Sequence, residues 1–129
     1  MESALEDSIL RGDVEAVRRA LEAGTDVDVR NAQGQSALML AAHRGDLALV
    51  ELLLARRADP DQRAKYGLSA LMLAVVGGHE AVARALARAG ADLRIVGSGA
   101  PGFAGKSAAD LAAERGLQEL AELLRPLDR

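Results

Sequence analysis

The 129-residue sequence contains no cysteine and no tryptophan, and its only aromatic residues are Tyr66 and Phe103. The absence of cysteine excludes disulfides and thiolate metal sites. Because aromatic side chains are nearly missing, alanine and leucine must fill the interior of a chain that is 50% apolar. Both residues favour helices, and their moderate size lets helices pack closely side by side.

The sequence also lacks a long apolar segment and an excess of basic residues. No apolar run approaches the ~18 residues that a membrane-spanning helix needs, and the acidic residues 1–7 do not form a secretory signal. The net charge of -3 disfavours generic nucleic-acid binding, which is typical of strongly basic domains. We therefore expect a soluble, cytoplasmic protein without a membrane partner, for which nucleic acid is an unfavoured ligand.

One segment of the sequence recurs. Residues 67–74, Gly-Leu-Ser-Ala-Leu-Met-Leu-Ala, match residues 34–41 with one change, and shorter copies begin at Ser3 and Ser107. A second set of markers keeps the same register: Gly12, Gly45, Gly78 and Gly116. Both sets are spaced by 33, 33 and 38 residues. Two independent markers in one register indicate a tandem repeat, and this period is typical of stacked supersecondary units.

Each copy of the repeat predicts two short helices. A serine stands where a helix N-cap belongs, an apolar segment such as 37–42 follows, and a glycine ends it. In the second copy another helix begins near Asp46 and ends before the turn residues 58–61. Helices of about 8–10 residues are too short to be stable alone in water. We therefore expect stacking between neighbouring copies to stabilise them. Five aspartates fall at the junctions between copies and are predicted to form turns: Asp26, Asp28, Asp59, Asp61 and Asp92.

These segments, namely Gly-x-Ser-Ala-Leu-Met-Leu-Ala, Gly-Asp or Gly-His, Val-x-x-Leu-Leu and Gly-Ala-Asp, resemble the ankyrin repeat. The resemblance implies an all-α ankyrin-repeat solenoid of stacked helix-turn-helix units with short β-hairpin-like finger loops. It further implies a single domain over residues 1–129. We expect repeats at about 1–30, 31–63, 64–96 and 97–129, with a five-residue insertion near 97–101.

The sequence departs from the ankyrin pattern at its Thr-Pro-Leu-His segment. Ser-Ala replaces Thr-Pro, and Met39, Met72 and Asp110 replace the histidine. The serine keeps the helix cap, whereas the loss of proline and histidine implies a less rigid turn and fewer hydrogen bonds between repeats. We expect both methionines to lie in the core; an adaptable methionine pocket is the alternative.

Charged residues gather near both ends of the chain, and the outer faces of a solenoid need polar residues. We therefore expect the first and last repeats to act as caps and the chain to be close to complete as given. The residues that indicate this are Glu2, Glu6, Asp7 and Asp13 at one end and Glu119, Glu122, Arg125, Asp128 and Arg129 at the other.

The inserted segment matches two nucleotide-binding patterns. Residues 97–102 fit Gly-x-Gly-x-x-Gly, and residues 100–107 fit Ala-x-x-x-x-Gly-Lys-Ser. A dinucleotide site needs a βαβ unit and a phosphate loop needs a parallel sheet, and helical repeats leave room for neither. Weak anion binding at the start of the helix after Ser107 is the alternative that stays open.

Metal binding and catalysis find little support in the sequence. His43 and His79 are the only histidines, and His79 belongs to the Gly-His pair that starts a second helix, which is a structural position. Without cysteine or a repeated histidine spacing we expect no metal site and no cofactor. The recurring serines are assigned to helix caps and the carboxylates to turns and surfaces, so no catalytic group can be assembled. We predict that the protein is not an enzyme.

The resemblance marks the finger tips and the exposed ends of the first helices as the partner-binding positions. Both aromatic residues fall on finger tips, and an arginine recurs at one helix position in three of four repeats; tyrosine and arginine are common hot-spot residues. The alternative is that the aromatic residues only pack against their own loops. The predicted binding residues are Arg11, Gln33, Gln35, His43, Arg44, Lys65, Tyr66, Leu68, Val76, Phe103, Lys106 and Arg115.

The resemblance therefore predicts a non-catalytic, monomeric scaffold that binds a partner protein through its concave face. Two alternatives stay open. One is an inhibitory or regulatory subunit of an enzyme. The other, disfavoured by the acidic charge balance, is a nucleic-acid-binding ankyrin protein that uses Arg11, Arg44, Arg63 and Lys65.

Overall fold

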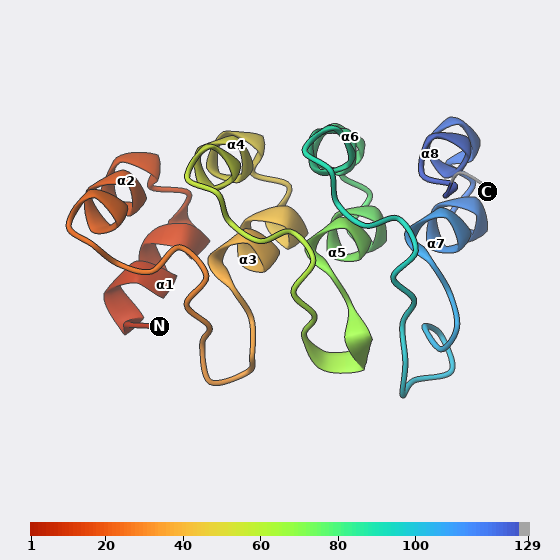
Figure 1. Ribbon diagram of the computed structural model, residues 1–129, viewed down its shortest axis with the longest axis horizontal. Coiled ribbons are helices and arrows are strands. Elements are labelled where there is room, and N and C mark those ends of the chain that lie inside the picture. Colours follow the sequence, from red (N-terminus) through yellow and green to blue (C-terminus); the bar gives the residue numbers. More distant parts are fainter. Residues whose placement is uncertain (127–129) are drawn as a thin grey trace.

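The computed structural model describes residues 1–126, whose helices form two rows (Figure 1). The inner row contains α1 (Ser3–Arg11), α3 (Ala37–Arg44), α5 (Ala70–Val76) and α7 (Ala108–Glu114). The outer row contains α2 (Val14–Glu22), α4 (Leu47–Ala55), α6 (Glu80–Arg88) and α8 (Gln118–Leu123). Each inner helix forms a pair with the outer helix that follows it, and we number these pairs units 1 to 4. Within residues 1–126 the only β-structure is a set of isolated bridges, so the predicted all-α solenoid is confirmed.

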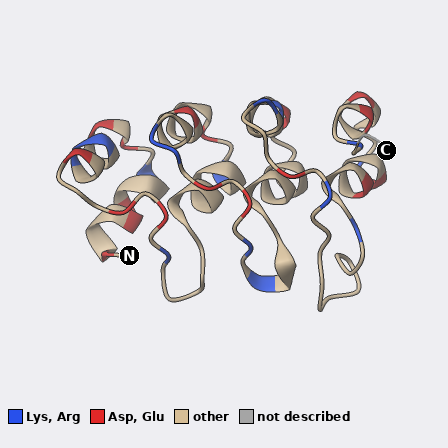
Figure 2. Ribbon diagram, viewed as in Figure 1, with Lys and Arg blue, Asp and Glu red and all other residues tan. Residues whose placement is uncertain are grey.

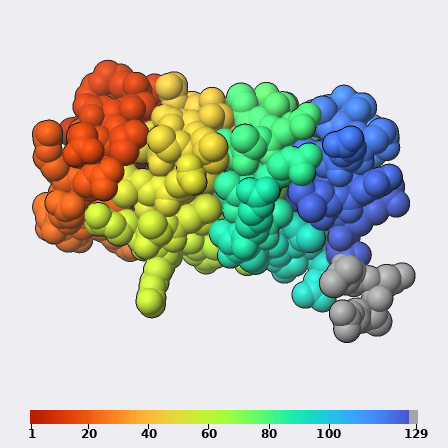
Figure 3. Space-filling model, turned by 90° about the horizontal axis from the view of Figure 1, so that it is seen from above, coloured from red at the N-terminus to blue at the C-terminus, as the bar shows by residue number. Residues whose placement is uncertain are grey.

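Three loops project from the inner row like fingers (Figure 1). They are finger 1 (residues 23–36), finger 2 (56–69) and finger 3 (89–107), and finger 3 is five residues longer than the others. Fingers 1 and 3 close with the antiparallel bridges Arg30–Ser36 and Val96–Ser107, while finger 2 contains a short 3-10 helix, η1 (Lys65–Gly67). A view onto the outer row shows the units stacked side by side along the chain (Figure 3).

Serine N-caps begin three of the inner helices. The hydroxyl oxygens of Ser36, Ser69 and Ser107 accept hydrogen bonds from backbone N–H groups three residues later, at 3.2, 3.3 and 3.2 Å. The predicted caps are thus confirmed at these positions, but the prediction for Ser3 is wrong. Helix α1 begins at Ser3, and its N-cap Glu2 makes no side-chain cap bond. Ser36, Ser69 and Ser107 have the extended backbone conformation of an N-cap, whereas Ser3 lies inside the first turn of its helix.

The outer helices begin differently in the two halves of the chain. Asp13 and Asp46 cap α2 and α4, each accepting a backbone N–H at 3.1 Å. His79 and Leu117 take the same place before α6 and α8 and make no side-chain cap bond. The ring Nε2 of His79 instead lies 3.0 Å from the carbonyl oxygen of His43, so it links α6 to the end of α3. This confirms the structural interpretation of His79.

Leucine, alanine and methionine form the core, as the composition requires. Met39 and Met72 are each 1% exposed, which confirms their placement in the core. Ala41 and Ala42 are fully buried and let neighbouring inner helices approach closely. Burying one leucine side chain stabilises the fold by roughly 1.5–3 kcal/mol relative to leaving it exposed. Stacking therefore supplies the stability that such short helices lack alone.

Aspartates hold the turns that lead from the outer helices into the fingers. Asp26, Asp59 and Asp92 each accept a hydrogen bond at 2.9 Å from the backbone N–H two residues later. Figure 2 shows these acidic segments recurring from unit to unit. The turn-forming role predicted for them is confirmed, because each carboxylate oxygen satisfies a backbone donor that the turn would leave unpaired.

The two ends of the solenoid agree only partly with the predicted polar caps. The exposed charged residues are Glu2, Asp7 and Asp13 at one end and Glu119, Glu122 and Arg125 at the other. Glu6 is different: it accepts a hydrogen bond at 2.9 Å from the Asn31 side chain, so it faces finger 1, which leads into unit 2, rather than the end. Asp128 and Arg129 lie outside the described residues.

Candidate functional site

The two aromatic side chains of the protein lie together at the tips of fingers 2 and 3. The ring centroids of Tyr66 and Phe103 are 5.8 Å apart, with their planes tilted by 31°. The ammonium of Lys65 lies 5.0 Å from the centre of the Tyr66 ring. Tyr66 is 38% exposed, and the tip of finger 2 is basic (Figure 2). The structure thus brings three of the predicted binding residues into one cluster, in which Lys65 and Tyr66 are exposed and Phe103 is half-buried. We call this cluster the aromatic patch.

The backbone of finger 2 holds Tyr66 in an unusual conformation. Its φ of 63° is left-handed, which costs a residue with a side chain roughly 1–2 kcal/mol. The carbonyl oxygen of Tyr66 accepts a hydrogen bond at 2.7 Å from the backbone N–H of Ser98 in finger 3. Strain that the surrounding structure enforces is common at functional positions. Here the strained residue is the one whose ring packs beside Phe103 and Lys65.

Finger 3 is shaped to place Phe103 beside that ring. The backbone N–H of Gly97 donates to the Lys106 carbonyl at 2.9 Å, and Gly97 accepts from Gly105 at 3.0 Å. A Cβ atom on Gly97 would lie 2.5 Å from the Phe103 carbonyl oxygen, so only glycine allows this approach. Phe103 is half-buried and packs against the core on its other side. The aromatic patch is therefore anchored through finger 3.

Leu68 does not belong to the exposed surface, and its predicted role as a binding residue is wrong. It is only 6% exposed and is part of the core. It directly precedes the N-cap Ser69, where an apolar side chain commonly turns inward against the first turns of the helix. The equivalent residue of finger 1, Gln35, is polar and stays half-buried.

Finger 1 presents polar groups that are partly engaged inside the loop. Asn31, which is 8% exposed, accepts backbone hydrogen bonds from Gln33 at 3.0 Å and Gln35 at 2.9 Å. Its side-chain amide donates to the Gln35 side chain at 3.0 Å. Gln33 is exposed at the tip, whereas Gln35 helps to hold the loop. Asn31 was not among the predicted site residues, because its role depends on the folded loop rather than on a recurring motif.

The exposed ends of the inner helices add charge and apolar area to the surface. Arg11, His43 and Arg44 are exposed. In unit 3 the half-buried Val76 takes the position of His43, and Gly77 takes that of the two arginines. Leu10 is 43% exposed beside Arg11. Arginines at these positions also interact favourably with the helix C-termini. They therefore stabilise their own helices and are at the same time accessible to a partner.

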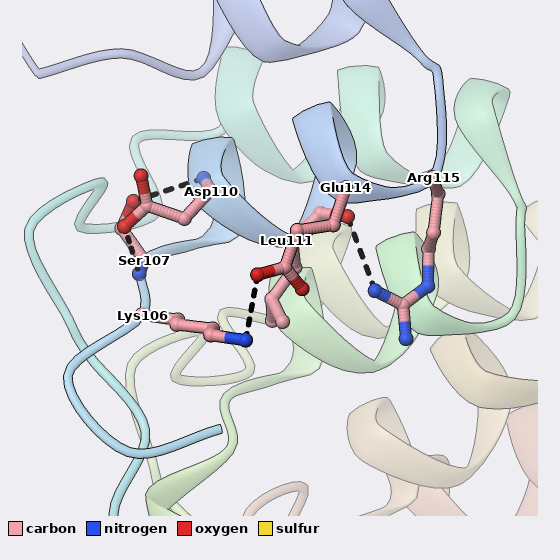
Figure 4. Close-up of polar contacts among 6 residues, drawn as sticks. All are labelled: Lys106, Ser107, Asp110, Leu111, Glu114 and Arg115. Carbon is pink, nitrogen blue, oxygen red and sulfur yellow. Dashed lines mark hydrogen bonds and ion pairs between the residues drawn. The ribbon is translucent and has the colours of Figure 1, made fainter. Parts of the chain in front are cut away.

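Finger 3 and α7 are joined by polar contacts that involve two predicted site residues (Figure 4). The Lys106 ammonium lies 2.6 Å from the Glu114 carboxylate, and Arg115 Nη1 donates to the Leu111 carbonyl at 3.1 Å. Lys106 is therefore already in an ion pair, while the exposed Arg115 uses one of its N–H groups inside its own unit. The aromatic pair and the arginines of units 1 and 2 are freer to meet a partner.

The glycine-rich insertion does not form a nucleotide site. It folds as a compact turn in which Phe103 and Ala104 both donate to the Ala100 carbonyl at 2.9 Å. Ser107 and Asp110 form a capping box, with a carboxylate oxygen of Asp110 accepting the Ser107 N–H at 2.9 Å (Figure 4). That carboxylate occupies the place where a phosphate would bind and would repel it. The capping box thus disfavours even weak anion binding at the start of α7.

Residues 1–126 contain no cluster of three or more histidine, cysteine or acidic side chains that could hold a metal ion. None of their helices has both the length and the apolar character needed to cross a membrane. The aromatic patch and the exposed ends of the inner helices instead combine aromatic, aliphatic and cationic side chains. Such a mixture is typical of recognition surfaces between proteins.

The comparison with protein families agrees with this architecture. A family model described as ankyrin repeats (3 copies) matches residues 5–97, and the chain belongs to the ankyrin repeat family. No curated protein matches the chain. Ankyrin repeats are generally protein–protein interaction modules, and the family is typically non-catalytic. The partners of this chain are therefore expected among proteins.

Proposed function

We propose that the protein binds a partner protein through the aromatic patch together with the exposed inner-helix ends of units 1 and 2. The observation that carries the proposal is the cluster of the exposed Lys65 and Tyr66 with the half-buried Phe103 at two neighbouring finger tips. A tyrosine that is already held by neighbouring side chains buries a large area on contact and loses little side-chain freedom. Family membership supports a protein as the ligand.

The composition of this surface indicates the chemistry of the partner. The rings of the patch call for an apolar projection on the partner surface, while Lys65, Arg11 and Arg44 call for carboxylates around it. Charge complementarity of this kind sets specificity and association rate more than affinity. The partner surface that fits best is therefore an apolar centre with an acidic rim.

The proposal is tested by affinity capture from the native host followed by titration of the purified partner. The double variant Tyr66→Ala, Arg44→Glu is expected to lose binding at least tenfold while its melting temperature changes by only a few degrees. Arg88→Glu is the matched control, since Arg88 lies in the last turn of an outer helix away from the patch. Normal binding by the double variant would show that the surface is wrong. The activity of the captured partner, measured with and without this protein, tells an inhibitor from a passive scaffold.

A further inference from the structure

A hollow of about 700 Å³ opens at the N-terminal end of the solenoid, between α1 and α2. It is lined by Ala4, Leu5 and Ser8 from α1 and by Ala16, Arg19 and Ala20 from α2. Leu5 and Ser8 form its floor and are each 8% exposed, whereas Ala16 and Ala20 are only half-buried. Its volume lies within the range of about 300–1,000 Å³ that is common for binding cavities.

The repeat register shows what normally covers this surface. The counterpart of Arg19, 33 positions later, is the half-buried Leu52. The other five lining residues correspond to Ala37, Leu38, Ala41, Leu49 and Leu53 of unit 2. Those residues are between 0 and 3% exposed, because α1 and α2 pack against α3 and α4. The same face of a unit is thus a helix-binding surface wherever another unit precedes it. In unit 1 the side chains on this face, among them Ala16 and Ala20, stay partly exposed.

Unit 1 differs from the other units in the size of two side chains. The positions of Ala16 and Ala20 hold large apolar residues in each later unit: Leu49 and Leu53, Val82 and Leu86, and Leu120 and Leu124. All six are at most 1% exposed. Two alanines in their place widen the groove between α1 and α2. A complementary occupant therefore needs bulkier side chains than the ones that fill the grooves between units.

A second copy of the chain does not fit this hollow. Positions that face the following unit include Glu6, as its bond from Asn31 shows, and the residues at the same register position are Met39, Met72 and Asp110. Asp110 is exposed in unit 4. The Asp110 carboxylate accepts the Ser107 N–H but forms no ion pair within residues 1–126. Stacking one copy on another would place its negative charge against an apolar surface, where burial without an opposite charge is unfavourable.

The rim of the hollow carries one acidic and one basic side chain. Glu2 and Arg19 both line it, and within residues 1–126 neither forms an ion pair. An amphipathic helix offers the matching pattern, since its apolar stripe is flanked by charged residues of both signs. Helix-in-groove binding of this type uses apolar anchors at positions i, i+3, i+4 and i+7.

We propose that this N-terminal hollow binds an amphipathic α-helix of a partner protein, whose bulky apolar side chains enter between α1 and α2. The site is separate from the aromatic patch and does not depend on the function proposed for it. It would give the protein a second binding surface, at the end of the solenoid rather than along its fingers.

The test uses a fluorescein-labelled synthetic 16-residue helical peptide, with leucine and phenylalanine at i, i+3, i+4 and i+7 and with lysine and glutamate on the flanks. Its fluorescence anisotropy is titrated with the full chain. The variant Ala16→Leu, Ala20→Leu fills the hollow and is expected to weaken binding at least tenfold. The matched control is Ala48→Leu, Ala81→Leu, at two exposed residues of the outer row. It is expected to change the affinity for the peptide by less than twofold.

The variant Ala16→Leu, Ala20→Leu is expected to fold, because units 2 and 4 carry leucine at both positions. Circular dichroism checks its helix content, and its melting temperature is expected to be at or above that of the parent chain. The Tyr66→Ala, Arg44→Glu variant is expected to bind the peptide normally. The proposal is overturned if the peptide shows no saturable binding, or if the filled variant and the control behave alike. It is also overturned if Tyr66→Ala, Arg44→Glu removes peptide binding, or if sedimentation shows self-association that Ala16→Leu, Ala20→Leu abolishes.

Discussion

The side chain of Asp61 accepts a hydrogen bond at 2.7 Å from the backbone N–H of Asp92, 31 residues further along the chain. Asp28 accepts in the same way from Asp59 at 2.8 Å. At the first two junctions one aspartate thus shapes the turn, and the aspartate two residues later links that turn to the next one. At the third junction Asp92 shapes the turn, and Arg94 stands two residues later. The acidic residues at the junctions therefore have structural roles, and no catalytic role is needed to explain them.

Replacing Asp61 with alanine is expected to lower the free energy of unfolding by about 1–2 kcal/mol, because the backbone N–H of Asp92 loses a charged acceptor. Asp61→Asn is the matched control, since the amide oxygen can still accept the hydrogen bond. Its loss of unfolding free energy is expected to be about half of that for Asp61→Ala. Urea denaturation measures both. Equal losses for the two variants would mean that charge, and not the hydrogen bond between units, is what matters at this position.

Gly97→Ala is expected to destabilise the protein by about 1–3 kcal/mol, the range for overpacking a close contact. The added Cβ would meet the Phe103 carbonyl oxygen and push finger 3 away from Tyr66. The control is Gly102→Ala in the same loop, where a Cβ would meet nothing within 4 Å and the backbone has no left-handed φ. It is expected to be neutral. Thermal unfolding followed with tyrosine fluorescence reports both stability and the position of the ring, and an unchanged Gly97→Ala variant would contradict the geometry.

The sequence predicted the repeat, the caps at Ser36 and Ser69 and the burial of Met39, because each of these follows from spacing and local chemistry alone. It did not predict that Leu68 turns inward, since the matching position of finger 1 holds a polar residue. Nor could it show that the tips of fingers 2 and 3 meet, because that contact depends on how the insertion folds.

The hollow at the N-terminal end could not be predicted from the sequence for a different reason. Charged residues such as Glu2 and Glu6 indicated a polar cap, but Glu6 faces unit 2 and leaves the end more apolar than expected. The hollow itself comes from small side chains at Ala16 and Ala20. A change of size at a buried position has consequences only through packing, which a pattern of polar and apolar residues does not record.

The two serines at the same register position, Ser69 and Ser3, are expected to respond differently to alanine. Ser69→Ala removes the cap of α5 and is expected to cost about 1 kcal/mol of unfolding free energy. Ser3 lies inside the first turn of α1 without a cap bond, so Ser3→Ala is expected to change stability by less than about 0.5 kcal/mol. Urea denaturation of the two variants decides the matter. A loss at Ser3 as large as that at Ser69 would show that α1 is capped like the other inner helices after all.

The left-handed backbone of Tyr66 is expected to reverse the usual order of stability between an alanine and a glycine substitution. Glycine is ordinarily less stable than alanine by about 0.5–1 kcal/mol in regular structure. At a φ of 63° alanine is strained and glycine is not, so Tyr66→Gly is expected to be more stable than Tyr66→Ala by about 1 kcal/mol. Both variants lose the ring and are expected to lose partner binding alike. The neighbouring residue provides the control: Lys65 has no positive φ, so Lys65→Ala should be at least as stable as Lys65→Gly. If alanine were the more stable replacement at both positions in urea denaturation, the backbone of finger 2 would not hold Tyr66 in the way that presents its ring to a partner.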